Sequence, residues 1–355
     1  MQTPKFVNKQ QSNFYQELKD RVNEYFNSKH IEKTGNARLY TKAIILVTIY
    51  LATLTHLLFF TPSNLWALLE CVLLGATTSA IGFNVMHDGA HGSFSKSEML
   101  NEMAAFSANM LGASSIMWKN KHNIVHHTYT NIDGVDDDIE IKPMLRLCSS
   151  QQRKWIHQFQ HIYVWFLYAM LLIVWLFFKD YKKYFTKKIG IIPLKKMSTG
   201  DHIKFWSAKI GYAALMIAFP IYKFGFLAWL AGYLVMAVST GLILSTVFQL
   251  AHTVEETSFP LPNDEHQIEN EWAIHQLATT ANFATENKLI SWYVGGLNFQ
   301  VEHHLFPKIS HIHYPALSKI IKETCQDFNI KYIEYKRMTE AMASHARHLR
   351  QMGVA

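Results

Sequence analysis

Long runs of apolar residues alternate with polar segments along the chain, and three of these runs have the length of a membrane span. Ala43–Phe60 and Phe226–Ala251 contain no acidic residue, lysine or arginine, and Leu65–Met86 contains only Glu70. About 20 mainly apolar residues in a helix cross the hydrocarbon core of a bilayer. The pattern therefore predicts an all-α integral membrane protein.

Two shorter apolar runs, Ile162–Phe178 and Phe205–Tyr222, are further candidates. Lys209 interrupts the second run, so hydropathy alone favours the first as a span. That choice would place the lysine-rich segment 179–209 outside, against the positive-inside rule. We therefore predict that Phe205–Tyr222 crosses the membrane. Ile162–Phe178, which is rich in tyrosine and tryptophan, is predicted to lie in the interface or to dip in and return.

Four spanning helices place both termini on the cytoplasmic side, with interfacial or re-entrant helices and a cytosolic helical cap around them. We predict a cytosolic N-terminal segment (1–40), a membrane domain (41–335) and a polar C-terminal tail (336–355). The first forty residues are polar, so a cleavable secretory signal is not indicated. The mixed charges after Pro307 predict an amphipathic cytosolic helix.

Eight histidines fall into three clusters and one single position, each beyond an apolar run. They lie in His87-Asp88-Gly89-Ala90-His91, in His122-Asn123-Ile124-Val125-His126-His127, in Gln300-Val301-Glu302-His303-His304, and at His252. Neutral imidazole is the commonest protein ligand for transition metals. Imidazoles without cysteine partners indicate iron, zinc, copper or nickel. The sequence thus predicts a membrane metalloenzyme whose histidines all lie on one side of the membrane.

The spacing within the clusters indicates how metals would be shared. Two pairs are four residues apart, His87/His91 and His122/His126, and two pairs are adjacent, His126/His127 and His303/His304. Residues four apart lie on one face of a helix, so each such pair can hold one metal. Adjacent residues point roughly 100° apart and can serve two different metals. Eight imidazoles exceed what one metal takes, which predicts a dinuclear centre.

Composition excludes other classes of site. The chain has three cysteines, Cys71, Cys148 and Cys325, far apart and in no Cys-x-x-Cys pair. Neither a disulfide framework nor a thiolate metal site is indicated. The formal net charge of +7 could indicate binding to nucleic acid. In a membrane protein, however, the distribution of lysine and arginine mainly indicates how the chain is oriented across the bilayer, so we predict no nucleic-acid partner.

The three motifs, His-Asp-x-x-His, His-x-x-x-His-His and Gln-x-x-His-His in this order, resemble the histidine boxes of the membrane fatty acid desaturases. Gln300 stands where many desaturases have a histidine, which resembles the front-end group, whose members insert a double bond between an existing one and the carboxyl end. The flanking segments Asn84–Ser95, Thr128–Glu140 and Gly295–Pro307 are similar to those of linoleoyl-CoA and acyl-lipid desaturases. The similarity runs from about Tyr40 to Tyr332.

This resemblance implies a non-haem diiron site with O2 as co-substrate. The implied iron ligands are His87, His91, His122, His126, His127, His252, His303 and His304, with Gln300 in or beside the shell. The implied reaction converts an acyl chain, O2, two electrons and two protons into a cis alkene and two waters. The acyl carrier, CoA or a glycerolipid, stays open.

Several polar residues are candidates to hydrogen-bond the free N–H groups of ligating imidazoles. Asp88 and Glu302 lie inside boxes, and Asp136-Asp137-Asp138 follows the second box, although an exposed acidic turn is the alternative for that triplet. His275, His311 and His313 are either such partners or solvated. We expect polar or interfacial surroundings for the histidines at positions 30, 157, 161, 202, 266, 345 and 348.

Many eukaryotic front-end enzymes carry a fused cytochrome b5 domain marked by His-Pro-Gly-Gly, a string that this sequence lacks. We therefore expect a separate electron donor, ferredoxin-like or cytochrome b5-like, with its reductase. The lysine-rich cytosolic surface is a candidate docking face. The alternative is that these lysines only set topology and touch anionic lipid.

Two rival functions remain at this stage. A diiron lipid hydroxylase would use similar boxes and return oxygen to the carbon. A metal transporter would place histidines and carboxylates near the bilayer midplane, whereas here they gather at the ends of the apolar runs. The small residues in Gly75–Ala80 and Ser239–Gly241 either permit close helix approach or shape an acyl tunnel.

Overall fold

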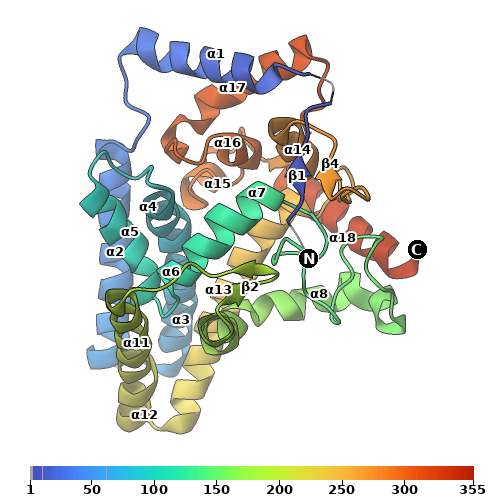
Figure 1. Cartoon of the computed structure of the whole chain (residues 1–355). Coiled ribbons are helices and arrows are strands. Elements are labelled where there is room, and N and C mark those ends of the chain that lie inside the picture. The colour runs from blue at the N-terminus through green and yellow to red at the C-terminus, as the bar shows by residue number, and fades with distance from the viewer. Residues whose placement is uncertain (1–2, 10, 61) are drawn as a thin grey trace.

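The structure, a computed structural model, describes residues 3–9, 11–60 and 62–355 of the chain. It is built almost entirely of helices, as the apolar pattern predicts. In Figure 1 long helices run together through the lower part of the molecule, and shorter helices cover their upper end.

Among the described residues, four helical segments are long and apolar enough to cross a membrane. The first two are α2 (Ala37–Thr55), which continues to Phe60, and α3 (Asn64–Ile81), which continues through α4 (His87–His91). The third joins α11 (Thr199–Ala213) to α12 (Phe219–Phe224), and the fourth is α13 (Phe226–His252). Four long apolar helices were predicted, and the segment around Lys209 is one of those found; the bent pair described below is the one further candidate among the described residues.

Large apolar side chains cover the outside of these four segments. Ile44, Leu65 and Ile210 are exposed, and the exposed fraction reaches 70% for Phe60 and 78% for Leu227. Exposed apolar surface on this scale marks a region that contacts something other than water. The belt therefore fits the hydrocarbon of a membrane.

The run that was predicted to lie in the interface is divided between two helical stretches. The first comprises the turn Trp155–Phe159 and α8 (Gln160–Ala169), and the second comprises α9 (Leu171–Val174) and α10 (Asp180–Thr186) with the turn between them. The two stretches meet at 62°. A bend of this size agrees with a segment that enters the interface and turns back.

A buried ion pair explains how α11 carries a lysine. The Nζ atom of Lys209 lies 2.7 Å from the Oδ2 atom of Asp180 and donates a hydrogen bond of 2.7 Å to the Gly112 carbonyl. Asp180 also accepts hydrogen bonds from the Ser114 backbone N–H (2.9 Å) and the Trp175 indole (3.0 Å). Charges within membrane segments are tolerated when they are paired in this way. The pair also joins α11 to α10.

Small residues allow the longest helices to pack closely. A Cβ atom on Gly75 of α3 would lie 2.6 Å from the Met236 carbonyl of α13, and one on Gly241 would lie 2.6 Å from the Ala169 carbonyl of α8. Both distances are too short for any side chain. The close approach expected from these small residues is therefore present, as in other membrane helix pairs.

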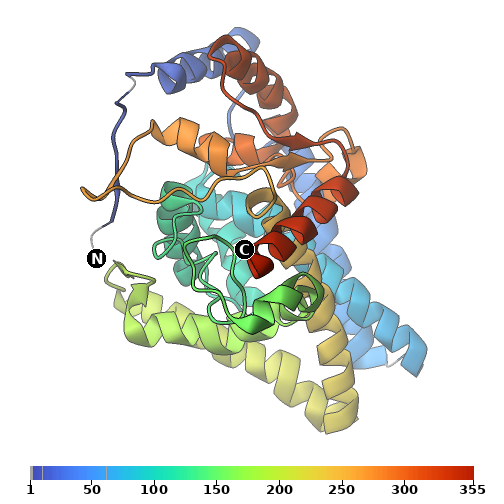
Figure 2. The same cartoon turned by 90° about the vertical axis from the view of Figure 1, so that its right-hand side faces the viewer.

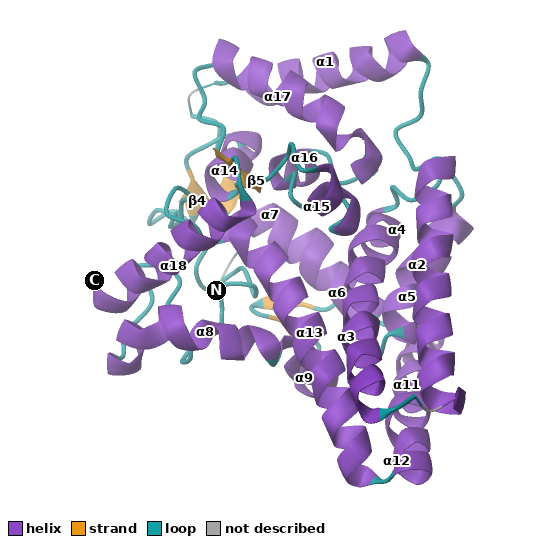
Figure 3. Ribbon diagram, turned by 180° about the vertical axis from the view of Figure 1, so that it is seen from behind, coloured by secondary structure: helices purple, strands orange, loops and turns teal. Residues whose placement is uncertain are grey.

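Shorter helices surround and cover the upper ends of the spans (Figure 3). They are α1 (Phe14–Lys29), α5 (Glu98–Met110), α6 (Ser115–Lys119), α7 (His127–Tyr129), α14 (Trp272–Thr279), α15 (Lys288–Tyr293), α16 (Gln300–Leu305), α17 (Tyr314–Asp327) and α18 (Met338–Val354). The strands described are two-residue pairs: β1 (Lys5–Phe6) parallel to β4 (Gln267–Ile268), β2 (Lys188–Ile189) antiparallel to β3 (Ile192–Pro193), and β5 (Asn282–Phe283) parallel to β6 (Glu334–Tyr335).

The N-terminal helix α1 is amphipathic and closes the top of the cap. Phe14, Leu18 and Val22 recur every four residues on one face, and all three are buried. This face packs with Leu317 and Ile321 of α17, in the segment predicted to be an amphipathic helix. Helix α17 thus shields the boxes beneath it.

The C-terminal helix α18 packs against α8 (Figure 2). The prediction of polar or interfacial surroundings is wrong for His157, His345 and His348, which are 2%, 1% and 4% exposed. His345 contacts the Tyr168 hydroxyl (2.7 Å) and the Thr253 carbonyl (2.6 Å). The polar neighbours in the sequence occupy the other face of α18, so local composition gave no sign of this burial.

We predict that Lys209→Met lowers the free energy of unfolding by about 3–5 kcal/mol, because it leaves the Asp180 carboxylate buried without its cation. Thermal unfolding of the detergent-solubilised protein measures the effect. Lys204→Met on the same helix is the matched control, because Lys204 is exposed. The double variant Lys209→Met/Asp180→Asn should recover part of the loss. A melting temperature for Lys209→Met equal to that of Lys204→Met would contradict the assignment.

Candidate metal centre

The eight histidines converge where the spans meet the cap. His87 and His91 lie on α4, at the end of the second span, and His252 is the last residue of α13. The second box forms a wide π-type turn, Asn120–His126, followed by α7, and the third box is α16. All eight side chains are buried, with exposed fractions of 8% or less.

Seven of these histidines form two groups among the residues that the structure describes. One group is His87, His91, His122 and His303, and the other is His126, His252 and His304. Within each group the potential ligand atoms lie within 4.8 Å of one another. The adjacent pair His303/His304 is therefore divided between the groups, as its spacing predicts.

His127 lies between the two groups. Its ring centroid is 4.9 Å from that of His91, 4.5 Å from that of His303 and 4.4 Å from that of His304. Its Nε2 atom is 3.2 Å from the Nε2 atom of His122. His127 thus contacts members of both groups.

The pairing of His122 with His126 on one metal is a prediction that the structure corrects. His122 belongs to the first group and His126 to the second. The two rings remain neighbours, with centroids 5.3 Å apart and nearly parallel planes, so their nitrogens do not converge on one point. Asp136 holds Nδ1 of His126 at 3.1 Å, and the other ring nitrogen lies with those of His252 and His304.

The nitrogen atoms that face the centre have no protein donor. In the described part of the chain, the buried Nε2 atoms of His91, His126, His252, His303 and His304 have no hydrogen-bond partner. The Nε2 atoms of His87 and His122 contact each other at 3.3 Å. A buried nitrogen without a partner is costly, and a metal ion would satisfy several of these lone pairs at once. The residues present therefore fit a metal centre.

The outer nitrogen of several rings is held by a second residue. The Nδ1 atom lies 3.1 Å from the Asp136 carboxylate in His126, 3.1 Å from the Tyr314 hydroxyl in His303, 2.8 Å from the Gln276 amide oxygen in His304, and 3.3 Å from the Thr279 carbonyl in His252. Such contacts fix the ring and direct Nε2 toward a metal.

Three of the acidic residues expected to support the imidazoles lie beside them: Asp88, Asp136 and Asp138, whose Oδ2 atom is 3.5 Å from the Nδ1 atom of His126. Asp136 contacts His126, and its Oδ2 atom also accepts a hydrogen bond from the Asn131 backbone N–H at 3.0 Å. Asp88 lies 4.0 Å from His87 Nδ1 and 2.9 Å from His311 Nδ1. His311, which the sequence left open, is therefore joined to the first box through Asp88.

Three other expected partners do not contact the eight imidazoles. Asp137 instead pairs with Lys183 at 3.1 Å, and His275 contacts the Thr130 carbonyl at 3.0 Å. Glu302 accepts hydrogen bonds from Tyr332 (2.6 Å) and Asn282 (2.7 Å). Each of the three is adjacent in sequence to a residue of the centre: Asp136, Gln276 or His303. Adjacent residues in a helix or turn point in different directions, so these three side chains face away from the imidazoles.

Sequence reasoning missed Gln276, Thr279 and Tyr314. Helix α14 supplies the first two and α17 the third. They lie far from the boxes they support, because His304 is 28 residues from Gln276. Only the tertiary packing of the cap reveals them.

The electrostatics of the centre favour neutral imidazoles with one exception. Burial, reinforced by the neighbouring imidazoles, lowers the pKa of His122, His127, His303 and His304 well below the usual value. Burial also opposes the charged form of His126, but the Asp136 carboxylate outweighs it and raises the pKa. Burial raises the pKa of Glu302 to about 6 despite its two hydrogen bonds. Neutral imidazole is the form that binds metals.

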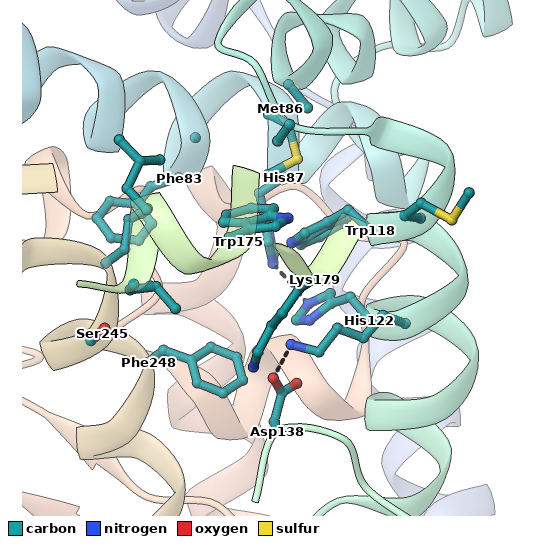
Figure 4. Close-up of a pocket in the computed structure, with 18 of the residues that line it drawn as sticks. Phe83, Met86, His87, Trp118, His122, Asp138, Trp175, Lys179, Ser245 and Phe248 are labelled. Carbon is teal, nitrogen blue, oxygen red and sulfur yellow. Dashed lines mark hydrogen bonds and ion pairs between the residues drawn. The ribbon is translucent and has the colours of Figure 1, made fainter. Parts of the chain in front are cut away.

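A cavity of about 190 Å³ lies against the first group (Figure 4). His87, His122 and Gln300 form part of its wall, and Phe83 and Phe248 are among its apolar lining. Gln300 is 2% exposed, and its Oε1 atom has no hydrogen-bond partner among the described residues. The arrangement brings an apolar chain within reach of the imidazoles.

Comparison with known proteins agrees with this site. A family model described as fatty acid desaturase matches residues 63–336. Among curated relatives, the sn-1 linoleoyl-lipid 6-desaturases of Arthrospira platensis and Synechocystis sp. are 35% and 36% identical, over 96% and 98% of this chain and 93% and 97% of their own lengths. The acyl-lipid (8-3)-desaturase of Physcomitrium patens is 33% identical over 99% of this chain and 74% of its own length.

These matches extend over nearly the whole chain and include the three histidine boxes, the four candidate spans and the cavity beside them. The chain therefore belongs to the fatty acid desaturase family, among its front-end desaturases, and is an oxidoreductase that acts on fatty acyl chains.

Proposed function

We propose that this protein inserts a cis double bond into a glycerolipid-linked acyl chain, on the carboxyl side of an existing double bond. The observation that carries the proposal is the cavity whose wall includes His87, His122 and Gln300. The printed names of the relatives support a lipid-linked substrate, because the three describe lipid desaturases. The overall reaction consumes the acyl chain, O2, two electrons and two protons and yields the alkene and two waters.

The two histidine groups would hold two iron ions, with His127 between them. Iron would supply the activation of O2 and the oxidising strength needed to remove hydrogens from an unactivated methylene. The protein's own contribution is positional. Asp136, Tyr314 and Gln276 orient the rings through their outer nitrogens, and Gln300 presents its amide to the cavity.

The cavity walls supply the remaining requirement, which is exclusion of water from the reacting carbons. Phe83, Trp118 and Phe248 line the space beside His87 and His122 (Figure 4). Their apolar surface replaces the hydration of an alkyl chain. A chain held in this way presents its methylenes to the centre in a fixed order, which regioselective chemistry requires.

Electrons would come from a separate ferredoxin-like or cytochrome b5-like protein and its reductase. Exposed lysines between α10 and α11 offer a basic surface for an acidic partner: Lys187, Lys188, Lys195 and Lys196. Complementary charge mainly increases the rate of such encounters. The surface lies in the segment that the positive-inside rule assigns to the cytoplasm.

The activity is tested in a host without polyunsaturated lipids that is fed linoleate. We expect a C18 triene with its new double bond on the carboxyl side, found first in glycerolipids, and none from His304→Ala. Mass spectrometry of fatty-acid derivatives locates the bond. A hydroxylated C18 product, or a bond on the methyl side, would contradict the proposal.

The metal content gives a separate prediction. Purified protein should contain about two iron ions per chain, because imidazoles that exceed the needs of one metal divide into two groups. Tyr314→Phe removes the contact with His303, so iron affinity should fall by about 10–100-fold in a chelator titration. Tyr335→Phe is the control, because its hydroxyl contacts Ser344 at 2.9 Å, away from the imidazoles. Activity with zinc alone would exclude iron chemistry.

We also predict that the active site and both termini face the cytoplasm. The three native cysteines are buried, so introduced cysteines can be labelled selectively. Lys188→Cys and Asp20→Cys should react from the cytoplasmic side, and Ser63→Cys, between the first two spans, from the opposite side. Labelling of position 188 together with position 63 would overturn this topology.

A further inference from the structure

The cavity has a charged end that the reaction outlined above does not use. Lys121, Lys179 and Lys183 line it together with Asp138 and Asp180. Figure 4 shows the Lys179 side chain reaching across the space toward Phe248 and Asp138. The remaining lining is mostly apolar and includes Leu111, Leu172 and Leu244. The cavity therefore suits an amphiphile with one polar end.

The charges at this end are paired with one exception. Lys121 forms an ion pair with Asp138, Lys183 pairs with Asp137 at 3.1 Å, and Asp180 pairs with Lys209 at 2.7 Å. Among the residues that the structure describes, Lys179 makes no hydrogen bond or ion pair. An ammonium group in a largely apolar cavity requires an acceptor, and the neighbouring carboxylates already have partners.

The backbone at Lys179 is held in place by the next residue. Asp180 is fixed by Lys209, by the Ser114 backbone N–H and by the Trp175 indole. A long lysine side chain on a fixed backbone can reach a defined part of the cavity. Because its backbone is anchored, Lys179 can hold the polar end of a substrate at one position in the cavity.

The charged end is close to the imidazoles. The Oδ2 atom of Asp138 lies 3.5 Å from the Nδ1 atom of His126, while its other oxygen pairs with Lys121, the residue before His122. A substrate whose polar end is held here has few carbons between that end and the centre. In an extended chain the carbonyl carbon and the sixth carbon are about 6 Å apart. This spacing suits desaturation near the carboxyl end.

We propose that the Lys179 ammonium donates a hydrogen bond to the acyl carbonyl oxygen of the substrate and so sets where along the chain the double bond forms. The ligand is a carboxylic ester or thioester of a long-chain fatty acid. Lys121 and Lys183 hold the adjacent carboxylates and leave Lys179 free for the carbonyl. The inference rests on the proposed function for its regiochemical consequence, whereas the contact itself can be tested by binding.

The binding test compares substrates with and without the carbonyl oxygen, in the absence of O2 so that no turnover occurs. Radiolabelled phosphatidylcholine with an sn-1 linoleoyl ester is compared with the matched sn-1 ether, and linoleoyl-CoA with its thioether. Wild-type, iron-loaded protein should bind the carbonyl compound about 10–100-fold more tightly, as expected for a hydrogen bond from a charged donor. The pair that shows this preference identifies the carrier.

Lys179→Met should bind the carbonyl and ether compounds equally, whereas Lys179→Arg should keep most of the preference. Lys182→Met is the matched control, because Lys182 is exposed on the same helical stretch, and it should behave as wild type. Iron content confirms that each variant is folded at the centre. In turnover, Lys179→Met should give a higher KM and a mixture of double-bond positions.

A carbonyl preference that persists in Lys179→Met would overturn the contact, as would a wild-type protein without any preference. If Lys179→Met gave a single, unchanged double-bond position, the claim that Lys179 sets this position would be wrong. Failure of wild type to desaturate either fed or purified substrate would instead reject the proposed function and leave the binding result interpretable.

Discussion

A cluster of buried, mostly neutral imidazoles with facing lone pairs is the constraint on which the rest of the structure depends. The Nε2 atoms of five of these rings find no donor in the described protein around them, and bound cations would satisfy these lone pairs. Until then the rings must be held in place by other contacts. Asp136, Tyr314 and Gln276 do this from three different parts of the cap, which explains why so much of the chain folds over one end of the spans.

The same cluster restricts the topology. Histidines from α4, α13 and α16 can meet only if the second and fourth spans end on the same side of the membrane, which requires an even number of crossings between the first box and His252. The third and fourth candidate spans supply two crossings, and the parity holds when the bent segment 155–186 turns back instead of crossing, which is the arrangement we propose. The Lys209–Asp180 pair joins the bent segment to the third span, so it stabilises the choice of topology as well as the packing.

The sequence predicted the features that depend on composition over a whole segment. Apolar runs located the spans, the lysine distribution decided between two ambiguous runs, and histidine spacing located the boxes. The features it did not predict depend on geometry that composition does not encode. His126 stacks on His122 but belongs to the second group, where Asp136 orients it. Gln276 and Tyr314 reach the centre only through the packing of α14 and α17, and the burial of His345 requires α18 to lie on α8.

One stretch of the chain, residues 119–138, joins two tasks that can otherwise be separated. It supplies His122, His126 and His127 to the centre, and through Lys121 and Asp138 it forms the charged end of the cavity. Asp138 contacts both His126 and Lys121, so this stretch places charged residues of the cavity beside the second histidine group, whereas Lys179, which we propose to hold the substrate carbonyl, comes from the bent segment. If Lys179 holds the substrate carbonyl as proposed, the position of the new double bond depends on both elements together, while the apolar part of the cavity determines which chains can reach it.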